Sequence, residues 1–216
     1  MTMTDPAGLR RVYERGTLDE ADVGTAWFPL LHEWFETAAA DPQVLEPNAV
    51  QLATVDATGA PSVRTVLAKG IDERGVVFYT NYASAKARDL EAEPRAAIAF
   101  VWLAQQRQVR ITGSVTKVSR ERTEEYFASR PRESQLGAWA SPQSQVVGSR
   151  AVLDEQLAEV SRRFADDAAV PAPPNWGGYL LEPDAVEFWQ GRTGRLHDRI
   201  RLRRANETWV RERLAP

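Results

Sequence analysis

Apolar residues recur every three or four positions in two parts of the chain, which predicts two amphipathic helices. The first covers residues 26–39, with Thr25 as its N-cap and Pro29 in its first turn. The second covers residues 150–165, and its apolar positions are Leu153, Leu157, Val160 and Phe164. Two shorter helices are expected at residues 84–91 and 119–129, the second with Ser119 as its cap.

Between these helices, short apolar or alternating runs separated by turn residues predict a series of β-strands. Residues 96–102 are apolar throughout, as expected of a strand buried on both faces, whereas residues 108–118 alternate between apolar and polar. The expected strands are residues 49–55, 62–69, 75–80, 96–102, 108–118, 176–181, 185–190, 195–203 and 208–213. Their short and regular spacing favours a closed or nearly closed antiparallel barrel, so the fold class is mainly β with flanking helices (α+β).

The domain organisation follows from where this periodicity begins. Residues 1–24 carry many charges and little periodicity, so a flexible N-terminal segment is expected there. Residues 25–216 are expected to form a single domain, and the proline-rich stretch at 171–174 is a stiff connector within it. No internal repeat or low-complexity tract interrupts the pattern.

Composition and charge narrow the function classes. The chain has no cysteine, which excludes disulfides, zinc–thiolate sites, iron–sulfur clusters and thiol nucleophiles, and no metal site is expected. The net charge of −3 gives no global basic field, so nucleic acid is not an expected partner and any phosphate binding must come from local clusters. No signal peptide and no apolar run of ~20 residues is present, so we expect a cytoplasmic protein without a membrane partner.

The last forty residues hold the densest set of chemically useful side chains. On the strand expected at residues 195–203, Arg195, His197 and Arg199 share one face. Together with Trp189, they suit a site that stacks a flat ring and holds anionic oxygens. The alternative is an edge strand with solvated charges, in which Trp189 is a core residue.

Two further segments are candidates for phosphate binding. A helix that begins near Ser84 offers free backbone N–H groups, to which Lys86 and the hydroxyl of Ser84 or Thr80 add polar groups. The alternative is a capped surface helix with a solvated lysine. Arg64 and Lys69 bracket the second strand, but they would face opposite sides of a regular strand unless a bulge intervenes.

The second candidate segment for phosphate binding surrounds Pro131. Tyr126 and Arg130 share a helix face, Pro131 ends that helix, and Ser134 caps the next turn. A phenol, a guanidinium and a hydroxyl would then converge on one phosphate, with the arginine binding it through two hydrogen bonds.

These segments, in this order, resemble the pyridoxamine 5'-phosphate oxidase family. The resemblance extends from about Glu46 to the C-terminus and includes the motifs Trp176-Gly177-Gly178-Tyr179 and Arg213-Leu214-Ala215-Pro216. It implies a dimeric split β-barrel with FMN bound between the subunits. It also implies oxidation of pyridoxamine 5'-phosphate, and of pyridoxine 5'-phosphate, to pyridoxal 5'-phosphate, with hydride transfer to flavin N5 and reoxidation of the flavin by O₂ to give H₂O₂.

The resemblance also implies a role for each matched residue. The positions that match FMN-binding residues are Arg64, Lys69, Tyr79, Thr80, Lys86, Gln108, Gln143, Ser144, Trp189 and Arg199. The positions that match residues around the substrate phosphate are Lys69, Tyr126, Arg130 and Ser134. Arg195 and His197 match the catalytic residues that lie over the substrate pyridine and its reacting carbon.

One departure from the family pattern affects cofactor binding. The family usually has Ser-Arg-Lys where this chain has Ser84-Ala85-Lys86, so FMN is expected to bind more weakly unless Arg88 replaces the missing guanidinium. Two other functions remain open at this point: a non-catalytic split-barrel protein that binds FMN or pyridoxal phosphate, and a different flavin reductase on the same barrel.

Overall fold

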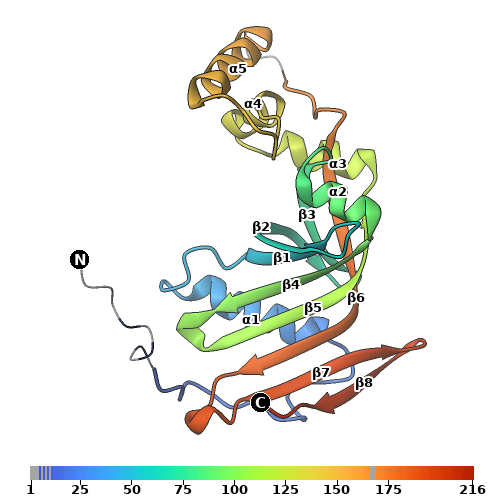
Figure 1. Ribbon diagram of the computed structural model, residues 1–216. Coiled ribbons are helices and arrows are strands. Elements are labelled where there is room, and N and C mark those ends of the chain that lie inside the picture. The colour runs from blue at the N-terminus through green and yellow to red at the C-terminus, as the bar shows by residue number, and fades with distance from the viewer. Residues whose placement is uncertain (1–4, 6, 8, 10, 166–168) are drawn as a thin grey trace. The chain divides into compact units, whose positions relative to one another are not determined.

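The computed structural model describes residues 5, 7, 9, 11–165 and 169–216 of the chain. Its helices and strands are shown in Figure 1. The strands are β1 (Ala49–Val55), β2 (Pro61–Asp72), β3 (Gly75–Asn81), β4 (Arg95–Trp102), β5 (Arg107–Lys117), β6 (Trp176–Gln190), β7 (Asp198–Ala205) and β8 (Thr208–Arg213). The helices are α1 (Phe28–Ala40), α2 (Ala85–Ala92), α3 (Arg120–Ala128), α4 (Arg132–Ala140) and α5 (Arg150–Arg163), with short 3₁₀ turns η2 (Leu103–Gln105) and η3 (Thr193–Arg195).

The strands form a split β-barrel. They are hydrogen-bonded in the order β3-β2-β1-β4-β5-β6, and a further pairing between β3 and β6 closes the ring, while β7 and β8 continue from β6. The closing pair is antiparallel and runs from Val76 opposite Leu181 to Asn81 opposite Trp176. Six of the seven residues of β3 are buried, as is typical of a strand covered on both faces. The expected barrel and fold class are confirmed.

The chain divides into two compact units. The first contains residues 1–50, 98–111 and 183–216, and the second contains residues 51–97 and 112–182. In the first unit, Trp34 of α1 packs edge-on against Phe188 of β6, with ring centroids 5.5 Å apart. A separate apolar cluster in the second unit is centred on Phe127 and Trp176. Within the described residues, no helix has the length and apolar character needed to cross a membrane.

Several helix boundaries differ from those expected. The helix α1 begins at Phe28 after Trp27, and no side chain caps it, so the prediction of Thr25 as N-cap is wrong. Ser119 does cap α3, because its side chain accepts a hydrogen bond from the N–H of Arg122. The prediction that Ser134 caps the next turn is wrong, because Pro131 itself occupies the N-cap position of α4.

The strands near the C-terminus also differ from prediction. Residues 176–190 form one continuous strand, β6, rather than two. The strand expected at 195–203 begins only at Asp198, because Gly194 and Arg195 have φ angles of 63° and 62° in the turn η3. Left-handed backbone cannot continue a strand. Arg195 and His197 therefore lie on the loop that precedes β7, and the prediction of one strand face shared with Arg199 is wrong.

Candidate active site

A buried lysine near the start of α2 lies among neutral oxygen atoms of the second unit. The Nζ of Lys86 donates to Oγ1 of Thr80 at 3.1 Å and to Oε1 of Gln143 at 3.0 Å. Oγ of Ser84, the N-cap residue of α2, lies 3.5 Å from the same nitrogen. Lys86 is only 9% exposed, and burial, reinforced by the charge of nearby Arg64, lowers its pKa. The side chains of Thr80, Ser84 and Lys86 thus lie together as expected, and Gln143 contacts the lysine as well.

Arg64 of β2 is held by a second set of polar groups. Its Nη1 donates to Oγ1 of Thr54 at 2.5 Å, and its Nη2 donates to Oγ of Ser62 at 2.6 Å. Oγ1 of Thr54 in turn donates to the carboxylate of Asp89 at 2.6 Å, and that carboxylate lies 3.5 Å from Arg64. Sequence reasoning missed Thr54 and Asp89, because they come to Arg64 only through the pairing of β1 with β2 and the packing of α2 beside these strands.

Arg130 lies on aromatic rings after the end of α3. Its guanidinium carbon is 4.7 Å from the ring centroid of Trp176 and 5.4 Å from that of Phe127. Its Nη1 is buried and has no hydrogen-bond partner among the described residues. Burial lowers the pKa of Arg130, opposed by the nearby phenol of Tyr126. A cation with an unused donor is ready to receive an anion.

A pocket of 270 Å³ contains Arg130 and one other residue expected to bind the substrate phosphate, Ser134. Arg130, Ser134 and Gln143 line it, together with Trp176. Tyr126 lies beside it in a stack of rings, with its centroid 4.0 Å from that of Tyr79 and 6.2 Å from that of Trp176. Burial raises the pKa of Tyr126, so its hydroxyl keeps its proton near neutral pH. The structure therefore brings Tyr126, Arg130 and Ser134 together, as expected.

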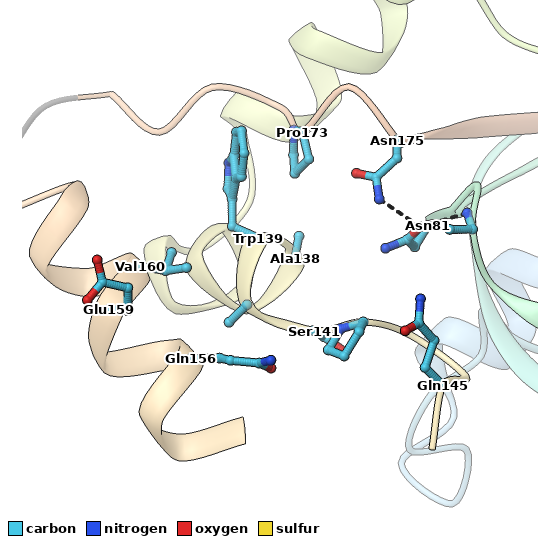
Figure 2. A pocket seen from close by; sticks show the side chains of 13 residues that line it. Asn81, Ala138, Trp139, Ser141, Gln145, Gln156, Glu159, Val160, Pro173 and Asn175 are labelled. Atoms are coloured by element: carbon cyan, nitrogen blue, oxygen red, sulfur yellow. Dashed lines mark hydrogen bonds between the residues drawn. The ribbon is translucent and has the colours of Figure 1, made fainter. Parts of the chain in front are cut away.

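A neighbouring pocket of 390 Å³ is shown in Figure 2. Trp139 of α4 and Gln156 and Glu159 of α5 line one part of it. Asn81 and Asn175 line another, joined by a hydrogen bond of 3.3 Å from Nδ2 of Asn175 to Oδ1 of Asn81. Among the residues that the structure describes, its lining contains no lysine or arginine, so this lining offers none of the cations of a phosphate site.

Lys69 lies at an irregularity of β2, the case that the sequence left open for Arg64 and Lys69. The β2–β3 register shifts between Ala68, which pairs with Phe78, and Gly70, which pairs with Val77. The shift is a β-bulge at Lys69, and it interrupts the strict alternation that would place Arg64 and Lys69 on opposite faces. The side chain of Lys69 is exposed, and Ser144, in a left-handed turn with φ 70°, is exposed too.

In the first unit, three rings meet at the end of β6. The ring centroids of Trp189 and His197 are 4.6 Å apart, and Tyr13 lies 5.9 Å from Trp189 and 5.7 Å from His197. The backbone N–H of Arg192 donates to Nδ1 of His197 at 3.1 Å, so the neutral imidazole carries its proton on Nε2. Tyr13 was missed because the segment around it has no periodic pattern.

Arg195 is exposed beside these rings. It lines a pocket of 480 Å³ together with Tyr13, Arg192 and His197. Its φ of 62° is unusual for a residue other than glycine and follows directly on left-handed Gly194. Such conformations store strain and cluster at functional sites.

Arg199 and Gln108 complete the expected set in the first unit. Nε of Arg199 donates to Oε1 of the buried carboxylate of Glu187 at 2.8 Å, and its Nη1 donates to the carbonyl oxygen of Ala215. Arg110 binds the other oxygen of Glu187 at 2.5 Å. Gln108, two residues before Arg110 on β5, is half-buried.

Arg88 does not take the place of the missing arginine at Ala85. Its Nη1 donates to the carbonyl oxygen of Ala83 at 2.6 Å, and the residue is exposed. The polar atoms around Lys86 in the structure come from Thr80, Ser84 and Gln143 instead.

Comparison with known proteins decides the family. Residues 36–164 match the family model described as pyridoxamine 5'-phosphate oxidase, and residues 176–216 match the one described as the pyridoxine 5'-phosphate oxidase C-terminal dimerisation region. The chain belongs to the pyridoxamine 5'-phosphate oxidase family. It is 57% identical to a pyridoxine/pyridoxamine 5'-phosphate oxidase of Saccharopolyspora erythraea over 215 residues, which cover 100% of this chain and 96% of that protein. It is 52% identical to the enzyme of the same name from Pseudomonas paraeruginosa, with 97% and 98% covered.

Solved structures of similar proteins agree with this family fold. PhzG from Burkholderia lata, in complex with tetrahydrophenazine-1-carboxylic acid, matches with a TM-score of 0.85 and 32% identity over 91% of this chain and 95% of that chain. A pyridoxamine 5'-phosphate oxidase-related, FMN-binding protein from Nostoc punctiforme matches with a TM-score of 0.71 and 20% identity, over 90% of this chain and 100% of that chain. The second likeness shows the fold alone.

Proposed function

We propose that this chain is an FMN-dependent oxidase that converts pyridoxamine 5'-phosphate and pyridoxine 5'-phosphate to pyridoxal 5'-phosphate, and that it acts as a homodimer. The observation that carries the proposal is a pair of cationic groups in the second unit. Lys86 contacts Gln143 directly, and Arg130 shares a pocket with Gln143. Two phosphate esters need two such groups, because each carries close to two negative charges.

The residues around Lys86 fit the phosphate of FMN. Among the described residues, the Lys86 ammonium donates to neutral oxygens and forms no ion pair with a carboxylate. Burial of the ammonium is costly and Arg64 adds a second positive charge nearby, and the carboxylate of Asp89 offsets these effects only in part, since the pKa of Lys86 is lowered. A phosphate would supply the missing charge and accept hydrogen bonds from Lys86, Arg64 and the hydroxyls of Thr80 and Ser84. Trp189, Gln108 and Arg199 are proposed to contact the flavin ring.

Arg130, Ser134 and Tyr126 would bind the phosphate of the substrate. The phenol and the hydroxyl donate hydrogen bonds, while the guanidinium supplies the charge and the donor that is still unused. A phosphate held away from the reacting carbon orients the pyridine ring, and orientation is a main source of rate enhancement in such a reaction.

Arg195 and His197 would act at the other end of the substrate. The pyridine ring would lie against His197, whose Nε2–H is free to donate to a ring substituent, and Arg195 would position the reacting carbon. The reaction removes a hydride from the 4' carbon and a proton from its amino group, and water hydrolyses the resulting imine to the aldehyde and ammonia. FMN, when bound, supplies the hydride acceptor, which O₂ reoxidises with formation of hydrogen peroxide.

The homodimer is supported by the C-terminal match. Residues 176–216 correspond to the dimerisation region of pyridoxine 5'-phosphate oxidase. This range contains Trp189, Arg195, His197 and Arg199, so the residues assigned to the ring chemistry lie in the part of the chain associated with dimer formation.

A direct assay tests the proposed function. The purified protein is titrated with FMN, and pyridoxamine 5'-phosphate is then added under air while pyridoxal 5'-phosphate and H₂O₂ are measured. We expect the two products in equal amounts, and far slower turnover of pyridoxamine without its phosphate. Bound FMN without peroxide would favour the non-catalytic binder, and a protein that does not bind FMN would exclude both.

The similarity to PhzG supports a second candidate substrate class, reduced phenazine carboxylic acids. A guanidinium such as that of Arg130 binds a carboxylate as well as a phosphate. The same assay with tetrahydrophenazine-1-carboxylic acid decides between the two classes, and we expect the phosphorylated pyridine to be the better substrate because the site offers Ser134 and Tyr126 in addition to Arg130.

A further inference from the structure

The side-chain amide of Gln106 binds the backbone of a segment far away in sequence. We call residues 11–18 the strap. Oε1 of Gln106 accepts hydrogen bonds from the backbone N–H groups of Glu14 at 2.8 Å and Arg15 at 3.0 Å. Nε2 of Gln106 donates to the carbonyl oxygen of Val12 at 3.4 Å. One amide thus holds three backbone groups of the strap, on both sides of Tyr13.

The backbone of Gln106 is itself fixed. It follows η2 with a left-handed φ of 57°, and its N–H donates to the carbonyl oxygen of Leu103 at 3.1 Å. Its carbonyl oxygen accepts from the N–H of Gly191 at 2.8 Å and from Nε2 of Gln190 at 3.1 Å. Gln190 is the last residue of β6 and directly follows Trp189, so the amide that holds the strap is attached to the strand end that carries Trp189.

The strap places Tyr13 against the residues proposed for ring chemistry. The ring of Tyr13 contacts those of Trp189 and His197. Gly191 permits this approach, since a Cβ atom there would lie 2.9 Å from Cγ of Tyr13. Tyr13, Val12 and Arg11 also line the pocket of 480 Å³ that contains Arg195 and His197.

The C-terminal end of the strap has an anchor of its own. The N–H of buried Leu18 donates to Oδ2 of Asp198 at 3.1 Å, and Nη2 of Arg213 donates to the Leu18 carbonyl oxygen at 3.2 Å. This anchor lies five residues after Tyr13 and is too distant along the chain to fix the tyrosine. The hydrogen bonds of Gln106 are made by residues next to Tyr13 or two positions from it.

We propose that Gln106 is a positioning residue of the substrate site, which holds the strap so that Tyr13 covers the pocket beside Arg195 and His197. The inference rests on the proposed function for the identity of the substrate. A strap in which most residues are exposed loses conformational entropy when it is ordered, and the three hydrogen bonds from Gln106 offset that cost before the substrate arrives. Tyr13 then contributes a wall that excludes water from the substrate ring.

Two variants with side chains of similar size distinguish the effect of the hydrogen bonds from the effect of side-chain shape. Gln106→Met keeps the length and removes all three bonds, whereas Gln106→Glu keeps an oxygen that accepts from both N–H groups. Both variants carry an unbranched side chain at the same left-handed φ, so backbone strain is matched. Gln51→Met, at an exposed position of β1 in the second unit, is the control for a glutamine outside the strap.

Three measurements are made on each full-length variant: the KM for pyridoxamine 5'-phosphate, the Kd for FMN, and the rate of tryptic cleavage after Arg11 and Arg15 in the strap. For Gln106→Met we expect a KM and a cleavage rate each raised about tenfold, because the lost hydrogen bonds held the strap in place. The Kd for FMN should match that of Gln51→Met. Gln106→Glu, which keeps the two bonds to N–H groups but loses the donor to Val12, should lie between the wild type and Gln106→Met in KM and cleavage rate.

Equal cleavage rates in Gln106→Met and Gln51→Met would overturn the proposal, as would an unchanged KM with faster cleavage. If the wild-type protein does not oxidise pyridoxamine 5'-phosphate, the proposed function fails separately. The cleavage rates then still decide whether Gln106 holds the strap, because trypsin acts on the strap whether or not the enzyme turns over.

Discussion

The Lys86 ammonium lies 3.0 Å from Oε1 of Gln143, and this contact links α2 to the loop that follows α4. An amide oxygen satisfies a hydrogen bond of the ammonium but does not compensate its charge. The same glutamine lines the pocket that holds Arg130 and Ser134. Gln143 therefore contacts the cation proposed for the FMN phosphate and lines the pocket of the cation proposed for the substrate phosphate.

Replacement of Lys86 by methionine tests the proposed FMN site. The change removes the buried charge while nearly preserving side-chain volume, so we expect the Kd for FMN to rise about 10- to 100-fold, as for loss of a hydrogen bond to a charged group. Quenching of FMN fluorescence measures it. Lys117→Met, which removes an exposed lysine on the ring of Tyr82, is the matched control and should leave the Kd unchanged.

The affinity for FMN should depend on pH through Lys86. Burial and the charge of Arg64 lower its pKa below the ordinary 10.5, so in the window between the lowered value and 10.5 the unfolded chain holds a proton that the folded, FMN-free protein has released. Stability without FMN should therefore rise with pH in this window.

Binding of a phosphate favours the protonated lysine, so FMN affinity should fall as pH rises through the same window. Titrations from about pH 7 to about pH 10 measure this slope. Lys86→Met should remove the part of this pH dependence of FMN affinity that the titration of Lys86 contributes. A slope that is equal in the variant and the wild type would show that another group titrates.

Ala85→Arg restores the guanidinium that the family usually has beside Lys86. Arg88 binds the carbonyl oxygen of Ala83 in this chain, so it does not supply the guanidinium that is missing at Ala85. We expect the Kd for FMN to fall about tenfold or more, the effect of one charge-assisted hydrogen bond. An unchanged Kd in Ala85→Arg would count against the idea that this chain binds FMN less tightly than its relatives.

Much of the fold could be read from the sequence because apolar and alternating runs mark where strands form. The prediction that the strand at residues 96–102 is buried on both faces is wrong, because residues of β4 alternate between buried and less buried and Val101 is 39% exposed. The apolar run at residues 96–102 and the alternation at 108–118 correspond to β4 and β5 within one or two residues. The strand expected at 195–203 failed at its start, because the turn around Gly194 is set by backbone φ angles that an alternating pattern does not reveal. The spacing of Arg64 and Lys69 left open whether a bulge lies between them, and only the β2–β3 pairing shows that one does.

The site was predicted best where its residues are close in sequence. Thr80, Ser84 and Lys86 come from one strand-to-helix connection, so local pattern brought them together. Thr54 and Asp89 reach Arg64 only through tertiary pairing, and no local signal marks them. Tyr13 lies in a segment without periodicity, for which the sequence predicts flexibility. Its place beside the site is visible only in the structure, where its ring contacts that of His197.

Arg130 should matter for the substrate and not for FMN. Loss of its charge in Arg130→Met is expected to raise the KM for pyridoxamine 5'-phosphate about 10- to 100-fold, since the variant lacks the charged donor proposed to bind the substrate phosphate. Arg130→Lys should rescue little, because a lysine cannot form two parallel hydrogen bonds and stacks less well on Trp176. An equal rise in the Kd for FMN would show instead that the variant disturbs Gln143.

Arg195 is predicted to act in turnover rather than in holding the cofactor. Its side chain is exposed in the pocket with His197 and lies in the first unit, whereas Lys86 and Arg64 lie in the second. Arg195→Leu should therefore lower kcat/KM for pyridoxamine 5'-phosphate by about 100-fold or more, as for removal of a charged group that contacts the reacting centre, with little change in bound FMN.

The φ of 62° disfavours any residue with a Cβ atom, so Arg195→Gly serves as the second variant: it removes the side chain and relieves the strain. Steady-state kinetics and the flavin absorbance of the purified variants check the prediction. If both variants lose FMN and activity in proportion, Arg195 supports the flavin and the assigned role is wrong; if Arg195→Gly keeps full activity, the left-handed turn matters and the guanidinium does not.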